Sequence, residues 1–182
     1  FKEYFEIHLG SGANGKSILD RLLFKVFGEY AENLDITFFT HEKTNSSQAS
    51  PELYNIKGRR IVLTSEPNND SELLENKVKL LTGGTYITTR PLFGNCVTFA
   101  PQCKCILSCN KFLKIQYDDG GLKRRLRILN FPTKFVDKPK EVNEKKINVE
   151  LHKKFDMWKM DFFNILLEYY DKFKKNGYKY PD

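Results

Sequence analysis

The sequence predicts an α/β fold in which helices flank a central, mostly parallel β-sheet. Three short segments, residues 4–9, 61–65 and 105–109, are rich in apolar and β-branched side chains and are typical of strands. After the first of them, apolar residues recur at helical spacing from Ile18 to Phe27. Strands that alternate with helices along a chain favour a parallel sheet with helices packed against it.

A glycine-rich loop joins the first strand to the first helix. Residues 10–17 fit the phosphate-binding pattern G-x-x-x-x-G-K-[S/T] at every fixed position. Glycines let the backbone curl until several N–H groups point at one anion, and the following helix adds the positive end of its dipole. The alternative is a chance glycine-rich turn, but strand, loop and helix stand in the order that nucleotide binding requires. The predicted nucleotide contacts are Gly10, Ser11, Gly12, Ala13, Asn14, Gly15, Lys16, Ser17 and Ile18.

Two residues of this loop carry distinct chemistry. We expect the Lys16 ammonium to reach the β and γ phosphates of a nucleotide. The Ser17 hydroxyl is the predicted ligand of the accompanying Mg²⁺.

Polar residues follow two of the predicted strands. Glu66 comes directly after residues 61–65, and Asn110 comes directly after residues 105–109. Ligands of an open parallel sheet lie beyond the carboxyl ends of its strands, so Glu66 is placed to orient water or to contact Mg²⁺ through water. The Asn110 amide is placed to hydrogen-bond the γ phosphate or the attacking water. A solvated carboxylate and a turn residue are the plainer interpretations of the two positions.

A predicted β arm runs out through residues 85–90 and returns through residues 96–99. Arg90 precedes its turn, and Phe93, Gly94 and Asn95 form the tip. An aromatic and an arginine near a tip suit a loop that stacks on bases and grips a nucleic-acid backbone. An ordinary surface hairpin is the alternative.

A cationic run precedes another apolar strand. Arg124 and Arg125 lie just before residues 126–131, where a rigid strand start can present an arginine finger to a nucleotide bound by a neighbouring subunit. A solvated charge run is the more common role of such a segment.

Composition sets broad limits on the protein. The chain has 182 residues, of which 40% are apolar, so one domain with a real core is expected. The formal net charge of +7 permits a polyanionic partner without establishing one. No membrane span or signal peptide is recognisable, so we expect no membrane partner and no secretion. The chain begins with Phe1 rather than Met and is expected to be a fragment of a larger protein.

The four cysteines are predicted to be free thiols. Cys103, Cys105 and Cys109 alternate with Leu107 along one strand and therefore share a face, unlike the close pairs of most zinc sites. Core thiols are the favoured interpretation, with zinc or disulfides as the alternative. Free thiols indicate a reducing compartment.

Taken in order, these motifs resemble the helicase domain of the superfamily 3 viral helicases. The residues concerned are Gly10 to Ser17, Arg60 to Glu66, Lys79 to Gly84, Arg90, Asn110, Arg124, Arg125, Phe131 and Pro132. The branch they are most similar to is the poxvirus-type primase-helicases of large DNA viruses, some phages and plasmids. The resemblance covers roughly residues 3 to 135.

The resemblance implies a fold of the AAA+ type and an ATP-hydrolysing DNA helicase. Lys16 and Ser17 then correspond to Walker A, Glu66 to the Walker B acid, and Asn110 to the sensor amide of motif C. Arg124 or Arg125 corresponds to the arginine finger. The cofactors implied are ATP and Mg²⁺.

The resemblance also implies the partners. Members of this family form homo-hexameric rings around single-stranded DNA, and the arm with Arg90, Phe93, Gly94 and Asn95 corresponds to the DNA-tracking presensor hairpin. An N-terminal primase or collar region of the same protein is expected, as is action in an infected host cell. We assign residues 1–140 to the ATPase core and residues 141–182, expected to be helical, to a lid or subunit-contact element.

This chain departs from the family pattern at two places. Ser65 precedes Glu66, where many members have two adjacent acids, although the viral branch shares the single acid. The arm tip is Phe93-Gly94-Asn95, where better-studied relatives have basic residues.

Three other functions remain open from the sequence. A protein-remodelling AAA+ ATPase would use the arm on polypeptide. A P-loop kinase would need a phosphate acceptor. A non-catalytic nucleic-acid-binding module would bind DNA in a salt-dependent manner without hydrolysis.

Overall fold

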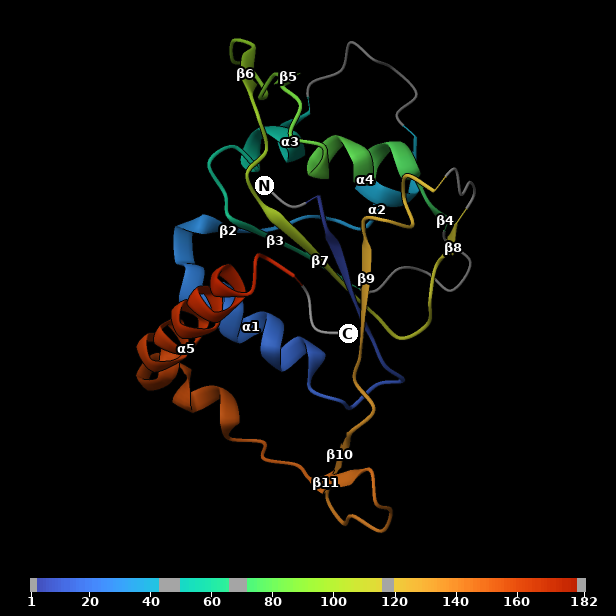
Figure 1. Cartoon of the computed structure of the whole chain (residues 1–182), viewed down its shortest axis with the longest axis vertical. Helices are drawn as coiled ribbons and strands as arrows, with labels where there is room; N and C mark the ends of the chain where they lie inside the picture. The colour runs from blue at the N-terminus through green and yellow to red at the C-terminus, as the bar shows by residue number, and fades with distance from the viewer. Residues whose placement is uncertain (1–2, 43–49, 66–71, 116–119, 180–182) are drawn as a thin grey trace.

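The computed structural model describes residues 3–42, 50–65, 72–115 and 120–179. Five parallel strands form the central sheet in the order β2-β3-β7-β1-β9 (Figure 1). Their bounds are β1 Phe5–Leu9, β2 Ala31–Asn33, β3 Ile61–Ser65, β7 Lys104–Cys109 and β9 Leu126–Asn130. The predicted α/β fold with a mostly parallel sheet is therefore confirmed.

Helices connect and cover these strands. The helices are α1 Lys16–Phe27, α2 Thr37–Thr40, α3 Pro51–Asn55, α4 Glu75–Thr82 and α5 Phe155–Lys175, with 3-10 turns at Gly28–Tyr30 and Leu151–Lys154. Helix α4 ends at Thr82, where the Gly83 N–H donates to the Lys79 carbonyl and Gly84 has a φ of 70°.

Strand register aligns the carboxyl ends of the central strands. Leu9 of β1 lies opposite Cys109 of β7 on one side and Asn130 of β9 on the other. Ser65, the last residue of β3, lies opposite Ser108. The loops that follow β1, β3, β7 and β9 therefore leave the same edge of the sheet, as a parallel sheet requires.

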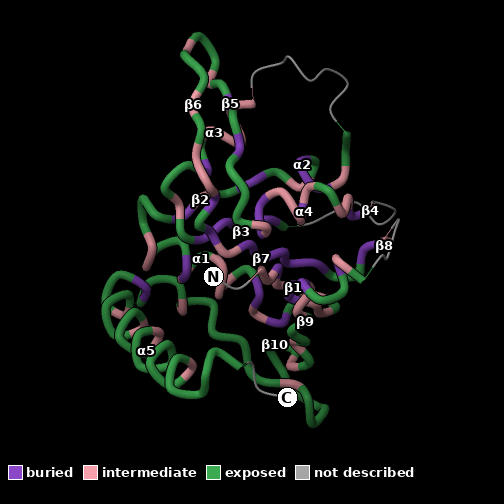
Figure 2. The backbone as a smooth tube through the Cα atoms, turned by 45° about the horizontal axis from the view of Figure 1, so that its top comes forward, coloured by how far each residue is buried: buried purple, intermediate pink, exposed green. Residues whose placement is uncertain are grey.

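The sheet separates two hydrophobic cores. One face carries Phe5, Ile7 and Leu107 and packs against α2 and α4, with Phe39 fully buried. The other face carries Leu63 and Ile106 and packs against α1 and α5. In Figure 2 the buried residues concentrate in the central strands, whereas most of α5 is exposed.

The fold shows which cysteines are buried and which is exposed. Cys103, Cys105 and Cys109 are buried in the core beside Leu107, and Cys96 is exposed. The prediction that the alternating cysteines face the core is confirmed. A hydrogen bond with Cys103 and burial raise the pKa of Cys105 well above its ordinary value, which keeps this thiol protonated.

Three small strand pairs lie outside the central sheet. Strands β5 (Ile87–Thr89) and β6 (Val97–Phe99) pair antiparallel and form an arm at one end of the molecule (Figure 1). Strands β4 (Glu72–Leu73) and β8 (Lys114–Ile115) pair in parallel. Strands β10 (Lys134–Val136) and β11 (Glu144–Lys146) also pair in parallel, at the other end of the molecule.

The helix expected over residues 141–154 is wrong. This segment contains β11 and a 3-10 turn instead. Its charged residues made a helix plausible, but the Glu144 carboxylate accepts hydrogen bonds from the Lys140 and Glu141 N–H groups, which fixes a turn. Helix α5, which starts at Phe155, is present within the segment expected to be helical and ends just before Asn176 and Gly177.

The buried sheet yields a stability prediction. Replacing Leu107, fully buried on the central strand β7, with alanine should cost about 2–5 kcal/mol of unfolding free energy because a cavity remains. Leu129 lies on the edge strand β9 with 53% of its surface exposed, so Leu129→Ala should cost less than about 1 kcal/mol. Urea unfolding measures both, and equal losses would contradict this assignment of the core.

Candidate nucleotide-binding site

The glycine-rich loop between β1 and α1 has a tightly curled backbone. Gly12, Ala13 and Gly15 all have positive φ, at 101°, 51° and 85°. At Gly10 a β-carbon would come within 2.8 Å of the Phe131 carbonyl oxygen, so a side chain has no room there. The loop thus has the backbone geometry that turns successive N–H groups toward one anion.

Lys16 begins α1 and is 6% exposed. Its Nζ donates to the Gly10 carbonyl at 2.7 Å, to Asn14 Oδ1 at 2.9 Å and to Asn110 Oδ1 at 3.2 Å. The structure therefore brings together two predicted site residues, Lys16 and Asn110, that are 94 positions apart in the chain. All three of these acceptors are oxygen atoms.

A cavity of about 910 Å³ opens beside the loop, and this volume lies within the range of nucleotide and cofactor sites. One wall is built from the loop, α1 and the strand ends. It comprises Gly12, Ala13, Asn14, Gly15, Lys16, Ser17, Ile18, Leu19, Leu22, Ser65, Ser108, Asn110 and Asn130. Of the predicted nucleotide contacts, Gly10 and Ser11 are not among the lining residues. Gly10 acts on the site through its carbonyl contact with Lys16.

The second wall of the cavity comes from the segment after β9. Its lining residues are Phe131, Pro132, Thr133, Phe135, Lys146, Ile147, Asn148, Leu151, Phe155 and Trp158. The Phe135 N–H donates to the Ala13 carbonyl at 2.7 Å, which ties this wall to the loop. The sequence singled out Phe131 and Pro132 only as motif residues and did not predict a site here, because the aromatic stripe that includes Phe155 and Trp158 is more often core packing. The sequence signal that could have identified part of this wall is the spacing of Phe155 and Trp158, which lie one helical turn apart.

A hydrogen bond between Asp20 and Ser108 links the helix after the glycine-rich loop to the central sheet. Asp20 on α1 accepts a hydrogen bond from the Ser108 hydroxyl at 2.8 Å, so it joins the helix that carries Lys16 to the strand that leads to Asn110. His8 lies opposite Ser108 and is 3% exposed. Within the described part of the chain, His8 Nδ1 and Asp20 Oδ1 are buried without a hydrogen-bond partner. Burial raises the pKa of Asp20, and Ser108, His8 and Lys16 oppose that rise.

Glu66 lies outside the described residues. Ser65, which directly precedes it, ends β3 and lines the cavity.

The two candidate finger arginines differ sharply in their surroundings. The Arg125 side chain is only 8% exposed, and it contacts Glu3 at 2.8 Å and the Gly121 carbonyl at 2.8 Å. The Arg124 side chain is 66% exposed and contacts Glu3 at 3.3 Å. Both precede β9, whereas Asn130 at the other end of β9 lines the cavity. Both therefore lie at the sheet edge opposite to the glycine-rich loop.

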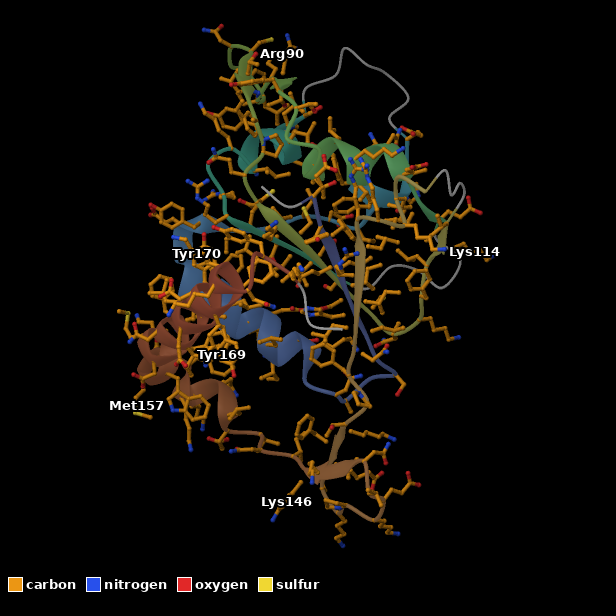
Figure 3. The ribbon with its side chains drawn as sticks, viewed as in Figure 1. Arg90, Lys114, Lys146, Met157, Tyr169 and Tyr170 are labelled. Atoms are coloured by element: carbon orange, nitrogen blue, oxygen red, sulfur yellow. The ribbon has the colours of Figure 1, made fainter. Side chains whose placement is uncertain are left out.

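The predicted DNA contacts gather at the turn between β5 and β6. Phe93 is fully exposed and has a φ of 60°, an uncommon conformation for a phenylalanine. A β-carbon at Gly94 would lie 2.5 Å from the Pro91 ring, so the tight turn favours glycine there. Figure 3 shows Arg90 at the end of the molecule farthest from Lys146 of β11. The structure brings Arg90, Phe93, Gly94 and Asn95 together and holds them away from the cavity.

Residues 8–125 match the model of a protein family described as a family of unknown function, DUF5906. The chain belongs to this family. The match includes the glycine-rich loop, the arm, Asn110 and both candidate finger arginines, but ends before the second wall of the cavity.

Relatives occur in several large DNA viruses. The chain is 36% identical to a protein named "Putative helicase" from Acanthamoeba polyphaga mimivirus, over 99% of this chain and 20% of that protein. It is 28% identical to a "Putative primase" of African swine fever virus, over 92% of this chain and 18% of that protein. The chain thus spans about a fifth of the length of these relatives. The predicted resemblance to helicases and primases of large DNA viruses is confirmed.

The C-terminal region of NrS-1 has a similar fold. Its apo structure superposes with a TM-score of 0.64 at 22% identity, over 88% of this chain and 36% of that one. A second apo structure of that region gives a TM-score of 0.62 at 21% identity, over 86% of this chain and 34% of that one. None of the helices in the described part of this chain combines the length and apolarity needed to cross a lipid bilayer.

The raised pKa of Asp20 predicts a pH-dependent stability difference. The folded state holds the Asp20 proton more tightly than the unfolded state, so the wild type loses stability as pH rises from the ordinary value of 3.8 through the folded pKa. Asp20→Asn removes this titration. The difference in unfolding free energy, Asp20→Asn minus wild type, should therefore increase as pH rises from 3.8 to the folded pKa and level off above it. Urea unfolding at several pH values would measure this difference.

Asp35 provides a control of opposite sign. Hydrogen bonds from the Thr37 hydroxyl and the Thr37 N–H lower the pKa of Asp35. Asp35→Asn should therefore lose stability relative to wild type as pH rises through the acidic range. The same sign of pH dependence for both variants would contradict the burial assigned to Asp20.

Proposed function

We propose that this chain is the ATP-hydrolysing motor domain of a viral primase-helicase, with an AAA+ fold of the superfamily 3 type. The observation that carries this proposal is the meeting of Lys16 and Asn110 at the carboxyl edge of the parallel sheet, beside a curled loop and a cavity of about 910 Å³. Ligands of parallel α/β sheets lie at this edge. The names of the viral relatives support the same function.

The residues at the site fit ATP and Mg²⁺. The positive φ values of Gly12, Ala13 and Gly15 suit a phosphate cradle, and Lys16 would exchange its present oxygen contacts for phosphate oxygens. Ser17 lines the cavity and would hold Mg²⁺, with Glu66 acting through water. Mg²⁺ would neutralise negative charge on the β and γ phosphates.

Asn110 would act as the sensor of the γ phosphate. Its amide already lies within hydrogen-bond distance of Lys16, so a phosphate bound by Lys16 would also lie near Asn110. Glu66 would orient the attacking water. Catalysis would depend on positioning and charge neutralisation and not on a covalent intermediate.

We assign the finger to Arg124. From Leu126 to Asn130, β9 spans about 13 Å at the usual rise per residue, so neither arginine reaches the cavity of its own chain. Both arginines contact Glu3, but the Arg124 side chain is 66% exposed and can meet a neighbouring copy, whereas the Arg125 side chain is 8% exposed and also donates to the Gly121 carbonyl. Arg125 would therefore support the strand start from which Arg124 projects.

This division of roles favours a homo-hexameric ring in which each ATP lies between two copies. The arm would follow single-stranded DNA in the centre, with Phe93 stacking on bases and Arg90 contacting phosphate. The longer protein would contribute a primase or collar region, in line with the name of the swine fever virus relative. It would act in the infected host cell.

Complementation between two inactive variants tests the shared site. Lys16→Ala should abolish ATP hydrolysis, and Arg124→Ala should reduce it by about 10³-fold or more. In an equimolar mixture, about a quarter of the head-to-tail interfaces would combine an intact Lys16 with an intact Arg124 from the neighbour. The mixture should therefore recover up to about a quarter of the wild-type rate in a steady-state ATPase assay.

The neighbouring cation provides the matched control. Lys123 is exposed and directly precedes Arg124, and Lys123→Ala should leave the rate nearly unchanged. Mixtures that assemble as the wild type does but recover no activity would contradict a finger supplied by the neighbour. Hydrolysis that is indifferent to both Arg124 and DNA would favour a P-loop kinase or a remodelling ATPase.

The arm yields a separate prediction about DNA. Phe93→Ala should weaken binding of single-stranded DNA by about 1–3 kcal/mol, because one stacked base is lost, while the salt dependence stays the same. Arg90→Ala should instead reduce the slope of affinity against salt concentration, because a phosphate contact is lost. Fluorescence anisotropy of a labelled oligonucleotide measures both effects.

Tyr170 on α5 is a suitable control for the arm. It is 54% exposed and lies on a different element (Figure 3), so Tyr170→Ala should leave DNA binding unchanged. An equal loss of affinity in the Tyr170 and Phe93 variants would argue against a specific role for the arm.

A further inference from the structure

The second wall of the cavity has a chemistry different from the first. Facing the glycine-rich loop, it presents the apolar side chains of Phe135, Ile147, Leu151, Phe155 and Trp158. The same wall includes the cation Lys146, but these five apolar side chains offer a phosphate no hydrogen bond, whereas a flat, weakly hydrated ring gains both burial and stacking against them. The cavity therefore has one end suited to charge and one end suited to a planar apolar group.

We propose that this wall is the binding site for the base of the nucleotide, with Trp158 as the stacking platform. The inference rests on the proposed function, because it places the base of the same nucleotide whose phosphates Lys16 would hold. It adds a specificity-determining surface from the segment after β9, beyond the glycine-rich loop and the strand ends.

The wall is fixed in position relative to the loop. The Phe135 N–H donates to the Ala13 carbonyl, and the Phe135 ring lies 3.3 Å from the position that a β-carbon on Gly15 would occupy. The Ile147 N–H donates to the Val136 carbonyl at 2.9 Å, which attaches the end of β11 to β10. A base on this wall would therefore stand at a set distance from phosphates on the loop.

Trp158 is anchored by its own helix. Phe155, one turn earlier on α5, is 5% exposed and fixes the start of the helix in the protein. The Lys154 ammonium lies 5.5 Å from the centre of a Trp158 ring, a cation–π contact that restrains the indole. Trp158 itself is only partly buried and lines the cavity, so indole surface is available to a ligand.

Polar groups in the same cavity can bind the edge of a base. Asn130, Thr133 and Asn148 line it together with the apolar residues. Asn148 Oδ1 accepts a hydrogen bond from the Glu150 N–H at 3.1 Å, which orients the side-chain amide. A few polar groups placed on an otherwise apolar wall are what a base requires, since its faces stack and its edge forms hydrogen bonds.

The experiment compares a nucleotide with its phosphates alone. Trp158 is the only tryptophan in the chain, so intrinsic fluorescence reports directly on this wall. Mg²⁺-ADP should change the emission, whereas inorganic tripolyphosphate, which has no base, should bind with little change. Calorimetric titration gives the affinity of each ligand for the wild type and the variants.

Trp158→Ala should weaken ADP binding by about tenfold or more and leave tripolyphosphate binding unchanged. Trp158→Phe keeps an aromatic face and should retain most of the affinity for ADP. Tyr169→Ala on the same helix, at a residue that is 63% exposed and outside the cavity lining, is the matched control and should have no effect. Thermal unfolding of each variant identifies any that fail to fold.

The other outcomes separate the two proposals. If ADP binds through Lys16 but Trp158→Ala and Trp158→Phe leave its affinity unchanged, the base site is overturned and the nucleotide-binding function stands. If wild type and Lys16→Ala alike bind neither ADP nor tripolyphosphate, both proposals are overturned.

Discussion

The contact between the Lys16 ammonium and the Asn110 amide is the interaction on which the organisation of this site depends. Lys16 starts the helix after β1, and Asn110 directly follows β7, so the contact requires β1 and β7 to be parallel neighbours whose carboxyl ends lie level. Their register meets that requirement at Leu9 and Cys109. A slip of one residue would move the side chains of the slipped strand to the opposite face of the sheet and into the wrong core, so core and site are specified by the same pairing.

Polar groups buried beneath this contact show how the site is supported at a cost in stability. His8 is buried, and Asp20 is half-buried with its Oδ1 atom enclosed, between α1 and the sheet, where apolar residues would pack more favourably. The hydrogen bond from Ser108 to Asp20 joins the two elements whose ends carry Lys16 and Asn110. Retaining a carboxylate in this position favours geometry over stability, a compromise common at functional sites.

Local patterns predicted much of the fold and about a third of the residues that line the cavity. The loop at residues 10–17 is contiguous, and the alternation of Cys103, Cys105 and Cys109 has the period of a strand, so both could be read from neighbouring residues. The wall carrying Phe135 and Trp158 comes from segments that only tertiary packing brings to the loop. The burial of Arg125 beside the exposed Arg124, and the contacts of both with Glu3 more than 100 residues away, likewise depend on tertiary packing that no local pattern contains.

The proposed finger places a further constraint on assembly. Arg124 and the glycine-rich loop lie at opposite edges of one sheet, so the proposed contact between two copies joins two different surfaces. A head-to-tail contact of this kind leaves one loop and one arginine unused at the ends of any open assembly. A two-fold dimer would use both arginines only if the loop and Arg124 of each copy lay in the same interface. In a ring, by contrast, the loop and Arg124 of one copy serve two different neighbours, and this matches their separation at the two ends of the sheet.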